Sequence, residues 1–481
     1  MKNQLKKKNS VGIGRNISVL YMGEILSQIL TLALIIVISR QLGDEGLGKY
    51  SFAFSFASIF LLLADLGMQT YVTKDVARNK KLVKEHLTKT LTLKFFLSII
   101  TFIITVAAIF LSKRDVETVL IVFLACTAMF FYGFAGIFRS VVQGVESMQY
   151  EVVAKTVERF VAAILGGVLL LNGYGIISLL YALIFSNVVY CLLLGYFTSK
   201  NISKLSVSFD FSYWKKIMKK SLPFCLTLIF ISLYVRIDTI LLGFIKGYAQ
   251  TGWYSAAYKI IDIFTRMLYV PILALFPAFV RAYKESSGET KMIYHKSIGY
   301  MVMLSMPITI GLIVLSGKII LLVYGHQFDN SGIALQILSC SLLFTSLNYL
   351  MGFLLNSVGK QKLFMISTGI ATVVNVLLNI IVIPKYGYVG ASVVTVMSEA
   401  LNFLLMHRFV KKSGFYIDLS KILVKPAIAS LVMSIFLVVL SGHVSLYILI
   451  PFGAFIYFTM MVVMKGVGKE EAHFLISLVR Q

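Results

Sequence analysis

The chain has 481 residues, of which 58% are hydrophobic and 14% are charged, and its mean hydropathy is +0.87. This composition excludes a water-soluble globular protein, because so large an apolar surface cannot be buried in a soluble core. The formal net charge of +24 does not indicate nucleic-acid binding, because the basic residues are spread over many short segments instead of one face.

Apolar stretches fill the chain from about residue 16 to about residue 465. Each is long enough to cross a bilayer, which takes about 20 residues in a helix. The sequence therefore predicts an all-α integral membrane protein with fourteen transmembrane helices. In chain order, their predicted ranges are 16–39, 47–70, 88–111, 116–142, 150–171, 175–198, 219–243, 250–280, 293–315, 332–357, 362–384, 387–410, 420–441 and 444–464.

Basic residues predict the orientation of these helices. Most of the 45 Lys and Arg residues lie in alternate connections, which we expect to face the cytoplasm. This asymmetry predicts a multi-pass protein of the cell membrane, plasma or inner, with both termini in the cytoplasm. Membrane lipids are expected partners, since part of the charge attracts anionic headgroups. The opposite, outer connections contain only Arg40, Lys49, Lys113, Arg114, Lys246, Lys318 and Lys385.

An internal repeat relates the two halves of the chain. Four residues of the first outer connection recur 204 residues later, and two residues of a later connection recur 212 residues on. Since six is an even number, two six-helix lobes would enter the membrane from the same side, which predicts a pseudo-twofold axis along the membrane normal. The repeated pairs are Gly48 and Gly252, Tyr50 and Tyr254, Ser51 and Ser255, Ala53 and Ala257, Tyr174 and Tyr386, and Gly175 and Gly387.

The repeat predicts four segments. They are an N-terminal six-helix lobe (1–200), a cytoplasmic linker (201–213), a C-terminal six-helix lobe (214–412), and an extra helix pair, helices 13 and 14, with a cytoplasmic tail (413–481). The linker and the residues after it have alternating apolar residues, basic ends and Trp214, a pattern typical of an amphipathic segment at the membrane surface.

Motifs for chemistry are missing from the sequence. The text nearest to an ATP-binding loop, GLIVLSGKII, has the wrong spacing and lacks a hydroxyl residue after Lys318. The outer connections are also too short to carry the acidic or basic groups of a membrane-bound glycosyl polymerase. We therefore predict that the protein is not an enzyme and uses no cofactor apart from a coupling ion.

Ionisable residues within the predicted helices are the candidates for a binding site, because such groups are costly in lipid and normally face protein or water. Arg139 and Arg236 have no opposite charge three or four residues away, so an anionic cargo is expected to contact them. Ion pairs within one helix are an alternative role for Lys259, Asp262 and Arg266. The predicted substrate-binding residues are Arg139, Arg236, Glu24, Lys259, Arg266 and Asp65.

Four segments of the sequence resemble a known family, and the similarity runs over essentially the whole chain. The segments are SRQLGDEGLGKYSFAFS, AGIFRSVVQGVESMQYEVVAKTVERF, VRIDTILLG with GWYSAAYKI, and NVLLNIIVIPKYGYVGASVVTVMSEALNF. The most specific part is Asn375 and Asn379 followed by Pro384, Gly387, Gly390 and Ala391. These segments resemble the Wzx-type oligosaccharide flippases and polysaccharide biosynthesis transporters of the multidrug/oligosaccharidyl-lipid/polysaccharide exporter (MOP) superfamily, whose fold is MATE-like.

The resemblance implies a function. A flippase of this family moves a polyprenyl-pyrophosphate-linked glycan from the cytoplasmic to the outer leaflet by alternating access of two lobes around a central cavity. Further implied partners are a polysaccharide polymerase and glycosyltransferases, and the protein would be a monomer. The alternatives are a flippase for lipid II or another cell-wall precursor, a drug/cation antiporter, and a non-transport scaffold or ligase.

The resemblance also implies a cation site in the second lobe. The matching positions are Asp238, Asn375, Asn379 and Thr395. Only one of them is charged, so the coupling ion could be Na+ or a proton, and a proton could be carried by Asp238 or by Glu399.

Overall fold

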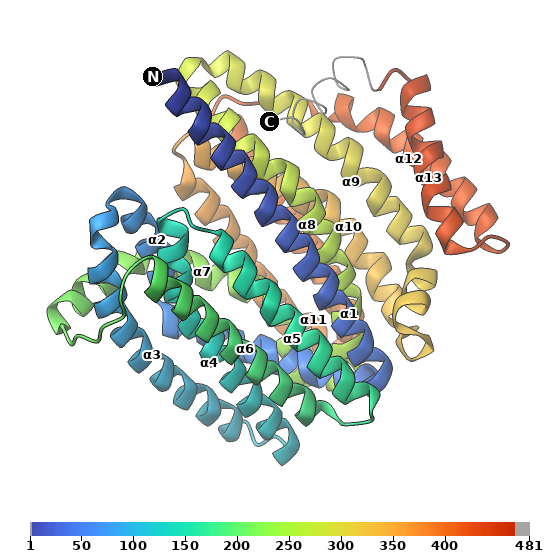
Figure 1. The fold of residues 1–481 in the computed structure, drawn as a ribbon. Helices are drawn as coiled ribbons and strands as arrows, with labels where there is room; N and C mark the ends of the chain where they lie inside the picture. The colour runs from blue at the N-terminus through green and yellow to red at the C-terminus, as the bar shows by residue number, and fades with distance from the viewer. Residues whose placement is uncertain (1, 467–481) are drawn as a thin grey trace. The chain divides into compact units, whose positions relative to one another are not determined.

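The computed structural model describes residues 2–466, and its side chains are described for residue 23 and for 26–466 apart from positions 223, 227, 274, 276, 277, 284 and 287. Within this range the elements are thirteen α-helices and two short 3-10 helices, with no strand (Figure 1). The chain divides into two compact units, Met1–Gly243 and Phe244–Gln481. The all-α prediction is confirmed for the described residues.

The helices follow one another with short connections. Those of the first unit are α1 (Lys2–Asp65), α2 (Met68–Arg78), α3 (Val83–Leu111), α4 (Val116–Gly144), α5 (Gln149–Leu171), α6 (Ile176–Asn201) and α7 (Phe211–Ile245), whose last two residues belong to the second unit. Those of the second unit are α8 (Tyr248–Glu285), α9 (Ser287–Tyr324), α10 (Ser331–Ser357), α11 (Gln361–Lys412), α12 (Leu419–Ser441) and α13 (Leu446–Val463). Several helices begin at a capping side chain, as at Asp115, whose carboxylate accepts a 2.9 Å hydrogen bond from the backbone N–H of Thr118.

The number of helices agrees with the predicted membrane spans. Within the described residues, ten helices are long and apolar enough to cross a membrane, and two of these, α1 and α11, each consist of two segments joined at a glycine. Division of α1 at Gly43 and of α11 at Gly387 turns these ten spans into twelve. Helices α5 and α8 are also long enough, but they contain several charged residues, and with them the count reaches the predicted fourteen.

The backbone preserves the repeat that the sequence predicts. Gly43 has φ 70° and ψ −169°, and Gly247 has φ 86° and ψ −177°. These glycines are 204 residues apart, which is the spacing of the repeated motif, and each lies five residues before a motif glycine, Gly48 or Gly252. A positive φ with an extended ψ is accessible mainly to glycine, so the same residue type makes the same turn twice.

Helix α4 is the centre of the first unit. It packs against α1, α2, α3 and α6, and α5 lies between α1 and α6. A buried apolar cluster at α2, α3, α4 and α6 also contains Trp214 and Ile217 of α7.

Trp214 is buried in protein, whereas the sequence predicts it in an amphipathic segment at the membrane surface. Its side chain is only 8% exposed, and its indole Nε1–H donates a 3.0 Å hydrogen bond to the carbonyl of Lys89 in α3. The indole is buried in protein because its one polar group has a backbone acceptor there. Residues 203–210, which precede α7, have no regular secondary structure.

Helix α10 is the centre of the second unit, where it packs against α8, α9 and α11. The predicted extra pair is α12 and α13, which lie side by side and pack on α9 (Figure 1). Tyr457 of α13 is fully buried there and donates a 2.9 Å hydrogen bond to the carbonyl of Met303 in α9. The predicted cytoplasmic tail falls mostly on residues 467–481, which lie outside the described residues.

Large apolar side chains are exposed along the helices, among them Phe110, Tyr447 and Ile164. A soluble protein would not expose aliphatic and aromatic surface on this scale, whereas lipid solvates it. The protein is a multi-pass membrane protein.

Candidate functional site

A buried ion pair lies inside the first unit. Lys94 of α3 is fully buried, and its ammonium Nζ lies 3.1 Å from Oδ1 of Asp65 at the end of α1. The same carboxylate oxygen accepts a 2.7 Å hydrogen bond from the side-chain amide of Gln69 in α2. Three helices therefore converge on one carboxylate, which stabilises a charge that burial alone would disfavour.

Arg139 of α4 continues this chain of hydrogen bonds. Its guanidinium donates to Oε1 of Gln69 and, over 3.1 Å, to the hydroxyl of Tyr132. It also lies 5.5 Å from the centre of the Tyr132 ring, and Tyr132 stacks on Tyr190 of α6. Both hydrogen-bond partners of the guanidinium are neutral, so the chain from Lys94 to Arg139 contains two cations and one anion. We name these five residues, Lys94, Asp65, Gln69, Arg139 and Tyr132, the N-unit network.

Two glycines make the N-unit network possible. Gly67 has φ 77° and separates α1 from α2, so the chain turns directly after Asp65. Gly136 of α4 faces Gln69, and a Cβ atom at this position would overlap the Gln69 side chain. The missing side chain thus leaves room for the amide that connects Asp65 to Arg139.

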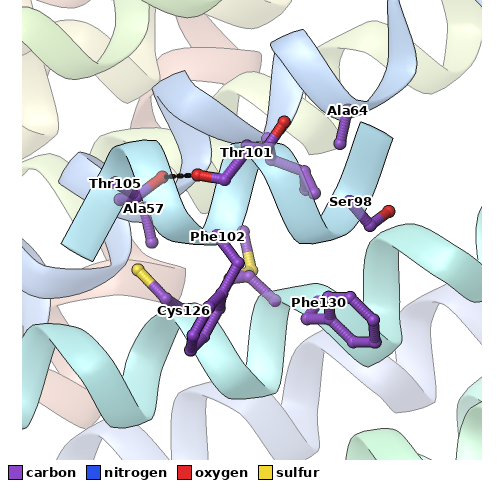
Figure 2. Close-up of a pocket in the computed structure, with 10 residues that line it drawn as sticks. Ala57, Ala64, Ser98, Thr101, Phe102, Thr105, Cys126 and Phe130 are labelled. Atoms are coloured by element: carbon purple, nitrogen blue, oxygen red, sulfur yellow. Dashed lines mark hydrogen bonds between the residues drawn. The ribbon is translucent and has the colours of Figure 1, made fainter. Parts of the chain in front are cut away.

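A small cavity adjoins the same helices. It is lined by side chains of α1, α3 and α4, among them Ser98, Thr101, Phe102 and Cys126 (Figure 2). The Thr105 hydroxyl donates a 2.6 Å hydrogen bond to the carbonyl of Thr101, so its donor already has a partner within α3. With about 20 Å³ of volume, the cavity holds no more than a water molecule and is too small for a substrate.

The other predicted cavity residues are distributed differently. Arg236 of α7 is exposed, and no described contact connects it to Arg139. Lys259 and Arg266 both pair with Asp262 on α8, at 3.9 Å and 3.1 Å, so the intrahelical ion pairs that their spacing allows are present. Glu24 belongs to α1, and its side chain lies outside the described residues.

A second polar cluster lies inside the second unit, on the two segments of α11. The Asn375 amide donates to Ser398 Oγ over 3.2 Å, and the Asn379 amide donates to Asn375 Oδ1 over 3.2 Å. Thr395 Oγ1 lies 3.1 Å from the hydroxyl of Tyr254 in α8. Two of the predicted ion-coupling residues, Asn375 and Asn379, are therefore held together by a hydrogen bond between neutral groups, and Thr395 is held by Tyr254.

Glu399 lies one residue beyond Ser398 and is the carboxylate of this cluster. It is 8% exposed, and its Oε2 accepts a 2.8 Å hydrogen bond from the side-chain amide of Asn348 in α10. The same amide also lies 3.2 Å from the backbone carbonyl of Glu399. We name the set Asn348, Asn375, Asn379, Ser398, Thr395 and Glu399 the C-unit network. Asp238, the remaining predicted ion-coupling residue, is buried in α7 of the first unit.

Sequence reasoning missed the neutral members of both networks. Gln69, Tyr132 and Asn348 carry no charge. Among the amide side chains in apolar stretches, only Asn375 and Asn379 are predicted site residues, because they match the family motif. An amide within a membrane span is itself a signal, because lipid offers it no hydrogen-bond partner. Within the described part of the chain, no three His, Cys, Asp or Glu side chains are grouped closely enough to hold a metal ion.

The comparison with protein families identifies the chain. The family described as "Polysaccharide biosynthesis protein" matches residues 13–283, which is more than half of the sequence. The protein belongs to this family. No curated protein sequence matches it significantly.

Solved structures show the fold of this family member. The chain is similar to the lipid II flippase MurJ in an inward closed conformation, with a TM-score of 0.78, 17% identity, and coverage of 92% of this chain and 98% of that one. It is also similar to an inward-facing multidrug resistance MATE transporter of the MOP superfamily (TM-score 0.65, 18% identity, 82% and 98% coverage). A MOP superfamily transporter from Pyrococcus furiosus matches with a TM-score of 0.55, 18% identity, and 82% and 94% coverage. The predicted MATE-like fold is confirmed.

Proposed function

We propose that the protein is a flippase that moves a polyprenyl-pyrophosphate-linked oligosaccharide from the cytoplasmic to the outer leaflet by ion-coupled alternating access. One observation carries the proposal: the guanidinium of Arg139, inside the first unit, hydrogen-bonds only neutral groups in the N-unit network. A guanidinium binds phosphate oxygens through two parallel N–H groups, so a pyrophosphate is a ligand that can replace these neutral partners. Membership of the polysaccharide biosynthesis family supports a glycan as the rest of the cargo.

The C-unit network is the proposed site of ion coupling. A proton on Glu399, or a sodium ion held by oxygens of Asn375, Asn379 and Thr395, would change the charge of a buried site and so favour one conformation over another. No cofactor besides this ion is proposed.

A flippase for lipid II or another cell-wall precursor is the second candidate. The fold similarity to MurJ favours it, and the chemistry at Arg139 would be the same, because lipid II also carries a pyrophosphate. A drug/cation antiporter is disfavoured, since the excess positive charge of the N-unit network repels organic cations.

Substitution of Arg139 tests the proposed function. We expect Arg139→Ala to abolish most surface glycan, while Arg139→Lys keeps part of it, because an ammonium retains the charge but not the two parallel donors. Arg408→Ala is the matched control, since Arg408 is an exposed arginine in the second unit. Normal export by Arg139→Ala at normal protein level would contradict the proposal.

The orientation with both termini in the cytoplasm is tested by cysteine labelling. Single cysteines at Glu45 and Gln327, both exposed in predicted outer connections, should react with an impermeant reagent added to intact cells. A cysteine at Lys204 should not react. Cys340 is replaced by Ser in all variants, because it is the exposed native cysteine among the described residues. Labelling at Lys204 in sealed cells would reverse the orientation.

A further inference from the structure

A cleft in the first unit is separate from the N-unit network. It lies between α2 and α7, and its volume is about 270 Å³. The lining residues are Tyr71, Lys74, Asp75, Arg78, Lys220 and Phe224. We name it the α2–α7 cleft.

The α2–α7 cleft has an excess of positive charge. Three of its side chains are cationic, and its one carboxylate, Asp75, already has partners: Oδ2 lies 2.9 Å from Nε2 of His86 and 3.3 Å from the hydroxyl of Tyr71. The ammonium and guanidinium groups therefore exceed the acidic charge within the cleft. An anion entering it would meet charges that the protein itself does not neutralise.

Aromatic rings hold the two lysines at the cleft walls. Lys220 Nζ donates to the Tyr71 hydroxyl over 3.2 Å and lies 5.7 Å from the centre of that ring. Lys74 Nζ lies 5.6 Å from the centre of the Phe224 ring. These contacts restrict the lysine rotamers, so less conformational entropy is lost when an anion binds.

Contacts with α3 fix the cleft walls in position. The Tyr213 hydroxyl lies 2.5 Å from Nδ1 of His86, and Lys89 Nζ lies 2.9 Å from Oδ2 of Asp210 just before α7. His86 thus connects α2 to α7 through its two ring nitrogens. These contacts hold the two walls of the cleft in place, as in a preformed binding site.

We propose that the α2–α7 cleft binds the phosphate group of a membrane lipid. The charge excess selects an anion, the aromatic rings of Tyr71 and Phe224 offer an apolar surface to the glycerol or isoprenoid part next to the phosphate, and the site lies on the side predicted to be cytoplasmic, where anionic headgroups attract basic segments. An anionic phospholipid and a polyprenyl pyrophosphate share this chemistry. Binding of a polyprenyl pyrophosphate rests on the proposed function, whereas binding of an anionic phospholipid does not.

Lipid titration of the purified full chain in a non-ionic detergent tests the site, with the unfolding temperature as readout. Dioleoylphosphatidylglycerol, dioleoylphosphatidylcholine and undecaprenyl pyrophosphate are the three probes. We expect phosphatidylglycerol or the pyrophosphate, but not phosphatidylcholine, to raise the unfolding temperature. The combined variant Lys74→Gln, Arg78→Gln and Lys220→Gln should need a lipid concentration about 100-fold higher for the same rise in unfolding temperature. Each basic residue near an anionic surface contributes about a factor of five to the affinity.

A matched variant separates the cleft from general surface charge. Lys362→Gln, Arg408→Gln and Lys412→Gln together remove the same charges from exposed positions of the second unit, and they should leave the titration unchanged. If the cleft variant is poorly folded, Lys74→Arg with Lys220→Arg should retain the wild-type response. An equal loss in both glutamine variants, or a wild-type response that does not distinguish phosphatidylglycerol and pyrophosphate from phosphatidylcholine, would overturn the proposal. A response to phosphatidylglycerol alone would confirm the site with phospholipid as its ligand, whatever the protein transports.

Discussion

The buried polar groups of the two units differ in charge. The N-unit network contains a fully buried lysine, an aspartate and an arginine, connected through Gln69. The C-unit network consists of amides and hydroxyls with one carboxylate, Glu399, which is bonded to an amide. The two networks thus differ in the charged side chains that they contain.

This difference suggests a division of roles. A network with excess positive charge suits an anionic cargo, whereas a carboxylate among neutral oxygens suits a proton or a small cation. It also implies that the units respond differently to substitution. Removal of one member of a buried ion pair leaves an uncompensated charge, while removal of an amide donor leaves its partner short of one hydrogen bond.

The largest expected effect is at Lys94. Lys94→Ala leaves the Asp65 carboxylate buried without its cation and should destabilise the protein by roughly 3 to 5 kcal/mol, as is typical of broken buried pairs. The double variant Lys94→Met with Asp65→Leu removes both charges and should recover most of that loss. Thermal unfolding in detergent measures both. A Lys94→Ala protein as stable as wild type would show that the ion pair is not structural.

Gly136 gives the next largest effect. Gly136→Ala places a methyl group against the Gln69 side chain and should cost about 1 to 3 kcal/mol, the usual range for overpacking. Gly167→Ala is the control: Gly167 is also a buried helical glycine, but its Cβ would meet nothing within 4 Å. That substitution should be neutral or slightly stabilising, because alanine favours helix. Equal effects at both sites would contradict the described packing of Gln69.

A smaller effect is expected in the C-unit network. Asn348→Ala removes the hydrogen bond to Glu399 and should cost about 0.6 kcal/mol and at most about 1.7, the range measured for hydrogen bonds between membrane helices. The comparison with Lys94→Ala is the informative one. A loss at Asn348 as large as that at Lys94 would mean that the two networks do not differ in the way their charges suggest.

The smallest effect concerns pH and lies outside the membrane spans. The hydrogen bond from Lys89 lowers the pKa of Asp210 below its usual value of 3.8. Because the folded-state pKa is depressed, the stabilisation is fully present above about pH 4 and is lost as the pH falls through the folded-state value. Asp210→Asn should therefore be slightly less stable than wild type at neutral pH, and the difference should disappear in acid. A difference that grows below pH 4 would have the wrong sign.

Particular residues show how far the sequence could predict this structure. Hydropathy was sufficient for the spans, because lipid forces every apolar stretch into a helix. The repeat motif predicted equivalent positions at Gly48 and Gly252, but not the turns five residues before them, at Gly43 and Gly247. Trp214 was assigned to the membrane surface, since composition does not reveal that a backbone carbonyl of α3 would accept its N–H.

The candidate site was predicted only in part. Arg139 was recognised from its charge, and Asn375 and Asn379 from the family pattern. The partner of Arg139 could not be predicted, because it depends on a turn at Gly67 that brings α2 against α4. The roles of neutral residues such as Gln69 and Asn348 depend on which helices they face, and the sequence does not show this.

Transport by purified protein in proteoliposomes tests whether Arg139 binds the cargo and Glu399 couples its export to an ion. A fluorescent polyprenyl-pyrophosphate-linked oligosaccharide is placed in both leaflets, and its accessibility to an external glycosidase is followed with and without a pH or sodium gradient. We predict that wild type exposes the glycan faster with one of the gradients than without it. Arg139→Ala should expose it no faster than protein-free vesicles, and Glu399→Gln should expose it at the same rate with and without the gradient. Equal rates for wild type, Arg139→Ala and protein-free vesicles would contradict the account.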